Sequence, residues 1–336
     1  MVFGLRFFFF TEILNLIEIA IIQTKTEDQS PIMSESATLP INFGGIAEEE
    51  FSGFEAARIL VLPVAYEGTV SYGTGTEAGA MAIVEASRNM ELYDEETDAE
   101  VYKLGIHTLD EFAPRETPEA MMNALYERAK ELLKEEKFLC MLGGEHSVSA
   151  PVIRAHAEKF HNLSILQIDA HADLRDEYDG TPHSHASIMA RVVKDLRIPS
   201  VQVGIRSISA DEARSLDSGL PTRIFWAKDI AGRIDWIDDA VNSLTENVYL
   251  TIDIDGLDPS LVPTTGTPEP GGLGWYETLT LIRKLAAKKR IIGMDLVEFS
   301  KTDNSDAPAF LCAKLVYKSL AYIFQNDTPK VRGKST

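Results

Sequence analysis

The sequence predicts an α/β protein with a mostly parallel β-sheet and helices on both of its faces. Two observations lead to this prediction. From about residue 57 onward, short runs rich in Val, Ile and Leu alternate with helix-length segments. Acidic residues and histidines directly follow several of these runs, and open α/β sheets bind ligands at the carboxyl ends of their strands. Alternation of strand and helix favours a parallel sheet, because each helix returns the chain to the starting edge.

The predicted strands are short apolar runs, which are typical of strands buried on both faces of a parallel sheet. They cover residues 57–64, 138–142, 163–168, 200–203, 223–225, 248–252 and 291–296. Helices are predicted over residues 118–137, 150–159, 275–289 and 308–324. One face of the first helix carries Met122, Leu125, Ala129 and Leu132. The last helix has Asp306 just before it as a predicted N-cap and Pro308 in its first turn.

The composition is that of a folded protein with a sizeable core. Of the 336 residues, 45% are hydrophobic and 25% are charged. The 32 basic and 52 acidic residues give a formal charge of -20, which argues against nucleic acids and anionic membranes as partners. This charge suits a cationic small substrate, although a solvated acidic surface is its commoner cause. The pattern contains no repeat or linker, so we expect a single domain over residues 33–336.

Residues 1–32 differ in pattern from the rest of the chain. Two apolar stretches, 7–10 and 13–22, are interrupted by two glutamates and an asparagine, which argues against a membrane-spanning helix. A signal peptide is disfavoured because the start has one basic residue and no small-residue cleavage site follows. We predict that Met33 is the true start, or that residues 1–32 form an N-terminal extension outside the native fold. Mass spectrometry of the native N-terminus tests this.

The chain has two cysteines, Cys140 and Cys312, and both lie in apolar patterns. They are predicted to be buried thiols. The sequence is therefore typical of a cytoplasmic protein without a disulfide framework.

The segment Asp169-Ala170-His171-Ala172-Asp173 carries the strongest local signal and directly follows a predicted strand. Side chains at i, i+2 and i+4 of a strand point the same way, so Asp169, His171 and, if the extended geometry persists, Asp173 converge. Three ionisable side chains at the end of a doubly buried strand are costly unless compensated. We expect a metal cation there; the alternative is a polar loop that accepts helix-cap hydrogen bonds.

A second segment, residues 251–259, repeats this pattern at the end of the predicted strand 248–252. Asp253 and Asp255 share one strand face, while Ile254 points into apolar packing. Asp258 precedes a proline and is predicted to be a turn residue. A single pair of alternating aspartates is as often structural as functional, but two such motifs at strand ends favour a shared site.

The third segment is Gly143-Gly144-Glu145-His146-Ser147, after the predicted strand 138–142. Its two glycines would let the backbone turn sharply and approach a ligand. His146 then lies at a strand end beside the other two motifs. Taken alone, it could equally be a hydrogen-bonded structural histidine.

Together the three segments supply two histidines and four aspartates as candidate metal ligands: His146, Asp169, His171, Asp173, Asp253 and Asp255. Oxygen-rich ligation with imidazole and no thiolate favours Mn(II) over a structural zinc site. The four carboxylates carry about -4 and balance two divalent cations, so a bridging water loses its proton easily. The predicted reaction class is metal-assisted hydrolysis.

With SHAS at 184–187, TGTPEPGGL at 265–273 and DLVEF at 295–299, these motifs resemble the ureohydrolase (arginase/agmatinase) family over roughly residues 55–325. The resemblance implies a three-layer α/β/α domain of the arginase/deacetylase type, with a mostly parallel eight-stranded sheet. It also implies two Mn(II) ions per subunit, with Ni(II) or Co(II) as possible substitutes, and a homo-trimer or homo-hexamer.

The resemblance assigns roles to individual residues. One ion would be bound by His146, Asp169, Asp173 and Asp253, and the other by Asp169, His171, Asp253 and Asp255. A metal-bridging hydroxide would attack the guanidino carbon, with Asp173 expected to take part in catalysis. His185 would shuttle protons and Glu298 would hold the guanidinium, while Thr267 would also bind substrate. His183 is predicted to line the pocket; a structural or solvated position is expected for His107, His156 and His161.

The favoured activity is hydrolysis of agmatine to putrescine and urea, a step of polyamine biosynthesis. The loop 174–182 lacks the asparagine and serine pattern with which arginases bind the α-carboxylate and α-amino groups. Glu269 and Pro270 stand where arginases usually have two apolar residues. Ala80 and Val84 depart from the family's usual proline and arginine, which affects only what can be inferred about the pocket entrance and subunit contacts.

Other substrates and other classes remain as alternatives. Related sequences act on guanidinobutyrate, guanidinopropionate, aminopropylagmatine, guanidine or arginine. A metal-dependent amide deacetylase would share the architecture but use one zinc ion and would not need all six ligands. A non-catalytic binding protein would be expected to have lost ligands, and none is missing from the motifs.

Overall fold

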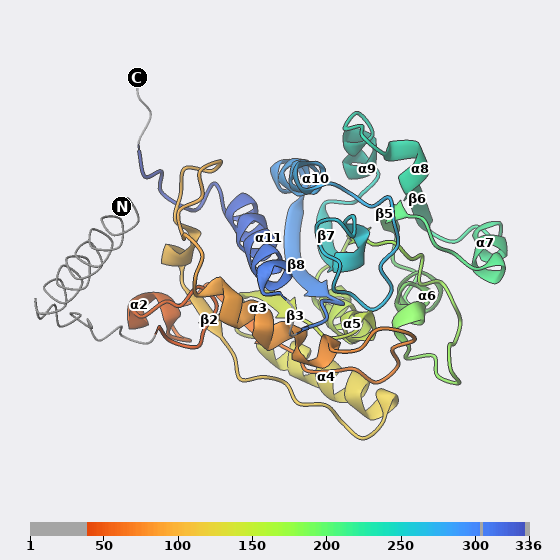
Figure 1. Ribbon diagram of the computed structural model, residues 1–336, viewed down its shortest axis with the longest axis horizontal. Helices are drawn as coiled ribbons and strands as arrows, with labels where there is room; N and C mark the ends of the chain where they lie inside the picture. The colour runs from red at the N-terminus through yellow and green to blue at the C-terminus, as the bar shows by residue number, and fades with distance from the viewer. Residues whose placement is uncertain (1–38, 303–304, 333–336) are drawn as a thin grey trace, which may run out of the picture. The chain divides into compact units, whose positions relative to one another are not determined.

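Eight parallel strands form one sheet in the order β2-β1-β3-β8-β7-β4-β5-β6 in the computed structural model, which describes residues 39–302 and 305–332 (Figure 1). The strands are β1 (Ile59–Pro63), β2 (Ile106–Thr108), β3 (Phe138–Leu142), β4 (Leu163–Ile168), β5 (Ser200–Ile205), β6 (Thr222–Trp226), β7 (Asn247–Asp253) and β8 (Arg290–Val297). Every pair of neighbours is parallel. The predicted eight-stranded parallel sheet is therefore confirmed.

Helices cover both faces of this sheet. Alternating strand residues pack into two clusters, because successive side chains of a strand point to opposite faces. Residues such as Val61 and Cys140 pack against the first set of helices, α3 (Gly79–Ser87), α9 (Ile237–Asn242), α10 (Trp275–Lys288) and α11 (Ala307–Ile323). Leu60 and Met141 pack against the second set, α4 (Pro118–Leu133), α5 (Ser149–Lys159) and α6 (Ile188–Ala190). The three-layer prediction is thus confirmed. The remaining short helices are α2 (Glu49–Ser52), α7 (Ala210–Leu216) and α8 (Ala227–Ile230).

Local signals explain where several elements begin and end. The Thr117 hydroxyl accepts a hydrogen bond from the Ala120 N–H at 3.2 Å and caps α4, which begins at Pro118. Asp306 occupies the N-cap position of α11 as predicted, but its side chain makes no capping bond. Its carboxylate instead pairs with the Lys301 ammonium at 2.9 Å, so this part of the prediction was wrong. Both cysteines are free and buried, as expected.

The four central strands bring the predicted site together. In the order β3-β8-β7-β4, the neighbours are in register near their carboxyl ends, where Leu142 pairs with Leu296 and Asp253 with Val297. Ile168 at the end of β4 pairs with Ile252 of β7. The motifs that follow these strands must therefore meet at one edge of the sheet.

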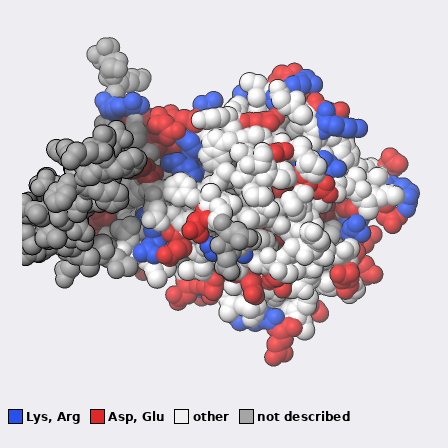
Figure 2. Space-filling model, in the orientation of Figure 1, with Lys and Arg blue, Asp and Glu red and all other residues white. Residues whose placement is uncertain are grey.

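Three predictions remain, which concern the surface charge, a membrane-spanning helix and the N-terminal extension. The face seen in Figure 2 carries acidic and basic side chains in small intermixed groups. None of the helices in the described part of the chain is long and apolar enough to cross a bilayer. The predicted extension, residues 1–32, lies outside the described residues.

Candidate metal centre and active site

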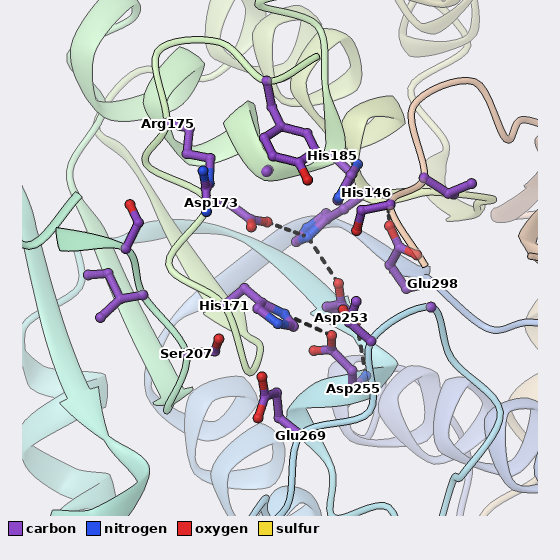
Figure 3. Close-up of a pocket in the computed structure, with 18 of the residues that line it drawn as sticks. His146, His171, Asp173, Arg175, His185, Ser207, Asp253, Asp255, Glu269 and Glu298 are labelled. Atoms are coloured by element: carbon purple, nitrogen blue, oxygen red, sulfur yellow. Dashed lines mark hydrogen bonds and ion pairs between the residues drawn. The ribbon is translucent and has the colours of Figure 1, made fainter. Parts of the chain in front are cut away.

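A cavity of about 310 Å³ opens at the carboxyl ends of the central strands (Figure 3). The side chains that line it come from the carboxyl ends of β1, β3, β4, β5, β7 and β8 and the segments that follow them. Among them are five of the six predicted metal ligands together with the predicted substrate residues: His146, His171, Asp173, Asp253, Asp255, His185, Thr267 and Glu298. The sixth predicted ligand, Asp169, is completely buried behind them.

One group of side chains surrounds His146. Its Nδ1 lies 3.1 Å from Asp169 Oδ2, 3.1 Å from Asp173 Oδ2 and 3.3 Å from Asp253 Oδ2. All four residues are at most 5% exposed. Within the described residues this Nδ1 has no hydrogen-bond partner of acceptable geometry. A buried imidazole nitrogen that faces three carboxylate oxygens is the arrangement expected of ligands around a cation.

A second group surrounds His171. Its Nδ1 lies 2.9 Å from Asp255 Oδ2 and 3.6 Å from Asp169 Oδ1. Asp169 thus directs one carboxylate oxygen to each histidine, which suits its predicted role as a bridge between two ions. Asp253 directs Oδ2 to the first group, while its Oδ1 accepts the Asp255 N–H at 2.9 Å. Its bridging role therefore stays a prediction.

The backbone brings two of these carboxylates into place by routes that simple strand alternation did not anticipate. Asp173 has a φ of 52°, in the left-handed region, so the extended geometry does not persist to this residue. Asp255 lies in a 3-10 turn, η6 (Ile254–Gly256), because β7 ends at Asp253. The two carboxylates reach the site, but the shared strand face predicted for Asp253 and Asp255 was wrong.

The residues fit a pair of divalent cations by charge as well as by position. Burial and the neighbouring Asp169 raise the pKa of Asp173 to about 7 when no cation is present. Burial, Asp255 and Asp169 raise the pKa of Asp253 well above its usual range. These shifts express the cost of crowding ionised carboxylates in a buried place, which a cation would remove.

Glu298 follows β8 and reaches the same cavity from a left-handed backbone conformation, with a φ of 63°. Its Oε1 accepts the His146 N–H at 2.6 Å, and its own N–H donates to the Gly144 carbonyl at 2.8 Å. A Cβ on Gly144 would lie 1.9 Å from the Tyr66 carbonyl oxygen. This glycine therefore permits close approach to the chain itself, rather than to a ligand as predicted.

His185 begins the short turn η4 (His185–Ser187) and is half-buried in the cavity wall. Its ring lies edge-on to Tyr178, with 5.7 Å between the ring centroids. Burial lowers its pKa to about 4, so the imidazole is neutral near pH 7. His183 lines a separate cavity of about 330 Å³ with Met122 and Tyr126, so its predicted position in the active-site pocket was wrong.

Comparison with known proteins gives the chain its family. A model of the arginase family matches residues 57–321. The chain belongs to the arginase family. It is 38% identical over 295 residues to an N(1)-aminopropylagmatine ureohydrolase of Synechocystis sp., covering 85% of this chain and 95% of that protein. An agmatinase of Pyrococcus horikoshii is 32% identical over 264 residues, covering 78% of this chain and 90% of the relative.

The solved structures agree with this membership. The crystal structure of an agmatine ureohydrolase of Thermoplasma volcanium matches with a TM-score of 0.75 and 26% identity, over 87% of this chain and 97% of that one. The resemblance to ureohydrolases expected from the motifs is thereby confirmed.

Motif reasoning missed several residues that shape the active site of this arginase-family chain. Arg206, directly after β5, donates to the backbone carbonyls of Asp255 at 2.6 Å and Glu269 at 2.8 Å. It therefore ties the loop that bears Glu269 to the turn that bears a predicted metal ligand. The cavity wall also includes Ser207 and Glu212. A basic residue at the end of a buried strand was the available signal for Arg206.

Proposed function

We propose that this arginase-family chain hydrolyses the guanidino group of a linear aminoalkyl guanidine to urea and an amine. N1-aminopropylagmatine is the proposed substrate, and agmatine is the second candidate. The observation that carries this choice is the 38% identity to a protein named for the first compound, against 32% to one named an agmatinase. The loop 174–182 and Glu269 favour both compounds over arginine, because neither compound has an α-carboxylate.

The proposed cofactor is a pair of Mn(II) ions held by His146, Asp169, His171, Asp173, Asp253 and Asp255. The two groups of buried side chains described above support this, since oxygen-rich sites with imidazole and without thiolate suit Mn(II). When bound, the ions would supply an activated water as the nucleophile and neutralise charge that develops on the substrate.

Glu298 is proposed to bind the guanidinium of the substrate. Its carboxylate lines the cavity and is held by the His146 N–H, so it is fixed before substrate arrives. Burial, followed by the neighbouring Glu145, raises the pKa of Glu298 well above its usual range when no cation is present. A planar guanidinium would offset this cost with paired hydrogen bonds to the two carboxylate oxygens.

His185 is proposed to pass a proton to the leaving amine. It is neutral at pH 7, so it can accept a proton in the cavity and release it within the same cycle. Thr267 lines the same cavity and is proposed to contact the substrate beside Glu298.

Glu269 is proposed to bind the distal ammonium group of the substrate. Its backbone is fixed by Arg206, and its side chain lines the cavity. The other glutamate in this part of the wall, Glu212, already accepts bonds from the N–H groups of Leu174 and Ser209 at 2.9 Å each. Among the described residues, no donor pairs with the Glu269 carboxylate, which leaves it available to a cationic ligand.

Urea release tests the proposal. The full chain, loaded with Mn(II), would be assayed with N1-aminopropylagmatine, agmatine, guanidinobutyrate, guanidinopropionate, guanidine and arginine. We expect the highest kcat/KM for N1-aminopropylagmatine, lower values for agmatine and no turnover of arginine. Preference for another guanidino compound would keep the reaction and replace the substrate.

Two controls separate this proposal from the other classes. Glu298→Gln should abolish urea release while two equivalents of metal stay bound, since it removes the guanidinium partner and no proposed ligand. One equivalent of metal and no urea from any compound, with Ni(II) and Co(II) also tried, would favour the amide deacetylase alternative. Light scattering would test the predicted homo-trimer or homo-hexamer.

A further inference from the structure

A buried carboxylate outside the predicted metal centre lies behind His185. Glu145 is completely buried, and its Oε2 accepts the N–H groups of Gly68 at 2.7 Å and Thr69 at 2.6 Å. Its Oε1 accepts the hydroxyl groups of Thr69 and Ser147, both at 2.6 Å. Four donors therefore satisfy the ionised form of this carboxylate without any cation.

The hydroxyl of Thr69 connects Glu145 to His185. Thr69 Oγ1 lies 3.1 Å from the His185 backbone nitrogen and 3.3 Å from its Nδ1. A hydroxyl has one proton, and that of Thr69 is donated to Glu145. Toward His185 the oxygen can therefore only accept, so Nδ1 must carry the imidazole proton. The competing hydroxyl of Ser184 lies farther from Nδ1, at 3.4 Å.

The other ring nitrogen of His185 is left with its lone pair. None of the hydrogen bonds among the described residues involves Nε2, and the ring lines the cavity beside Glu298 and Asp173. A neutral imidazole protonated at Nδ1 accepts a proton at Nε2 and returns it from the same atom.

The same construction occurs a second time in this chain. Thr251 donates its hydroxyl proton to the buried Asp295 at 2.6 Å and lies 2.9 Å from His146 Nε2. His146 is thus protonated at Nε2, and its Nδ1 faces the carboxylates. In both places a threonine donates its proton to a buried carboxylate and therefore accepts from one imidazole nitrogen, which leaves the other nitrogen free. The free nitrogen is Nε2 in His185 and Nδ1 in His146.

We propose that Thr69 and Glu145 are a positioning pair that holds His185 as the Nδ1–H tautomer, with Nε2 free toward the substrate. The proposal rests on the proposed function in one respect, since Nε2 is the atom through which the proton of the leaving amine would pass. The atom balance is simple. Nε2 takes one proton and gives it to the amine nitrogen as the C–N bond breaks, while the Nδ1 proton and the Thr69 proton stay where they are. The Glu145 carboxylate keeps the Thr69 hydroxyl proton turned away from His185, so the Thr69 oxygen stays directed at Nδ1.

Three variants of the full chain test the pair. Thr69→Val removes the hydroxyl at nearly constant volume, and Thr69→Ser keeps it. Thr76→Val is the matched control, because Thr76 is also buried in this segment and donates its hydroxyl to Glu67 at 3.0 Å, with no histidine attached. We expect Thr69→Val to lower kcat about 10-fold or more and to change KM less than about twofold, since positioned proton transfer contributes to kcat. Thr69→Ser and Thr76→Val should stay within about threefold of wild type.

A purely structural role for Thr69 predicts another outcome. It would lower the unfolding temperature of Thr69→Val, and any loss of kcat would not be restored by Thr69→Ser. Either a loss that serine does not restore or an unchanged kcat in Thr69→Val would overturn the proposal.

Neutron diffraction of deuterated wild-type crystals reads the tautomer directly and needs no substrate. Deuterium on His185 Nδ1 with none on Nε2 is the expected result. Deuterium on Nε2 alone would overturn the proposal even if the kinetics agreed. Should the wild-type chain release urea from no guanidino compound, the proposed function fails, whereas the neutron map still decides the tautomer.

Discussion

His146 Nε2 lies 2.9 Å from the hydroxyl of Thr251, a completely buried residue of β7. Because Thr251 donates its own proton to Asp295, it accepts from His146 Nε2 and leaves the Nδ1 lone pair facing Asp169, Asp173 and Asp253. Thr251 and Asp295 thus orient His146 with Nδ1 toward the predicted metal position. Groups that orient a metal-binding histidine in this way raise metal affinity.

Replacing Thr251 by valine should therefore weaken metal binding. We expect the dissociation constant of the more tightly held Mn(II) to rise about 10- to 100-fold, since His146 loses the acceptor that fixes its tautomer. Competition with a chelator measures this constant. Thr251→Ser should stay near wild type, and Thr278→Val, at another buried threonine, controls for loss of a hydroxyl. Unchanged affinity in Thr251→Val would contradict the role given to this hydroxyl.

Removal of metal should make the stability of the protein depend on pH in a defined direction. Burial and the neighbouring Asp169 raise the folded pKa of Asp173 to about 7, above the ordinary value of 3.8 for an aspartate. A carboxyl group whose pKa is raised by folding binds its proton more tightly in the folded state than in the unfolded state. Its contribution to stability is therefore present at low pH and is lost as pH rises through about 7. Burial lowers the pKa of His171, but Asp169 and Asp255 raise it to about 12 overall, which acts in the same direction.

We accordingly expect the unfolding temperature of the chelator-treated protein to fall as pH rises from about 6 to about 8. Asp173→Asn should show a shallower fall. With Mn(II) bound the trend should reverse, because metal binding displaces protons and strengthens with pH. Thermal unfolding with and without chelator measures both trends, and a metal-free protein that is most stable at the highest pH would refute the explanation.

Glu269→Gln should weaken the binding of the proposed substrate with little effect on the chemical step. Loss of a charged hydrogen bond of roughly 1.5–3 kcal/mol corresponds to a rise in KM for N1-aminopropylagmatine of about 10- to 100-fold, with kcat nearly unchanged. Glu177→Gln removes the same charge from an exposed position outside the cavity wall and should leave KM unaltered. Equal effects of the two substitutions would show that Glu269 acts only through the general field of the protein.

The parts of the fold and site that could be predicted from sequence are those with local causes. β3 and β4 have the predicted bounds, because each is a short, mainly apolar run that ends directly before one of the site motifs. β2 was not predicted from the residues, since this three-residue edge strand has His107 at its centre and no apolar run. The convergence of the metal motifs followed from parallel strands that share one edge. The backbone route to Asp173 did not, because a left-handed residue is set by surrounding contacts.

Residues that act through distant partners could not be predicted at all. Thr69 and Glu145 are 76 positions apart, and the sequence near each gives no sign of the other. Arg206 donates to the carbonyl of Glu269, 63 positions away. His183 lies two residues before His185 and yet lines a different cavity, whereas His185 begins the turn η4 and lines the active-site cavity. Contacts between residues that are far apart in the sequence can therefore be identified only from the structure.

The completely buried His156 of α5 should make the protein sensitive to acid for a reason independent of the metal centre. Its Nδ1 lies 2.8 Å from the Val152 carbonyl oxygen, and within the described residues its Nε2 has no partner. This confirms the structural position expected for His156. Burial lowers its pKa from 6.5 to about 4. A histidine whose pKa is lower in the folded state stabilises the protein above the unfolded pKa, and this contribution is lost as pH falls toward the folded pKa.

The size and sign of this effect can be measured by substitution. Between pH 6.5 and pH 4 the unfolded chain binds a proton that the folded chain excludes, which removes roughly 3 kcal/mol from the free energy of unfolding. His156→Leu should lose the Val152 hydrogen bond but keep the packing against Tyr249, and its free energy of unfolding should fall less steeply over this range. Urea unfolding at pH 6.5 and pH 4.5, with chelator in both buffers, isolates the effect from metal release. His161→Leu, at an exposed position, controls for loss of a histidine. If His156→Leu and wild type lose the same free energy between the two pH values, burial of His156 is not a source of the acid sensitivity.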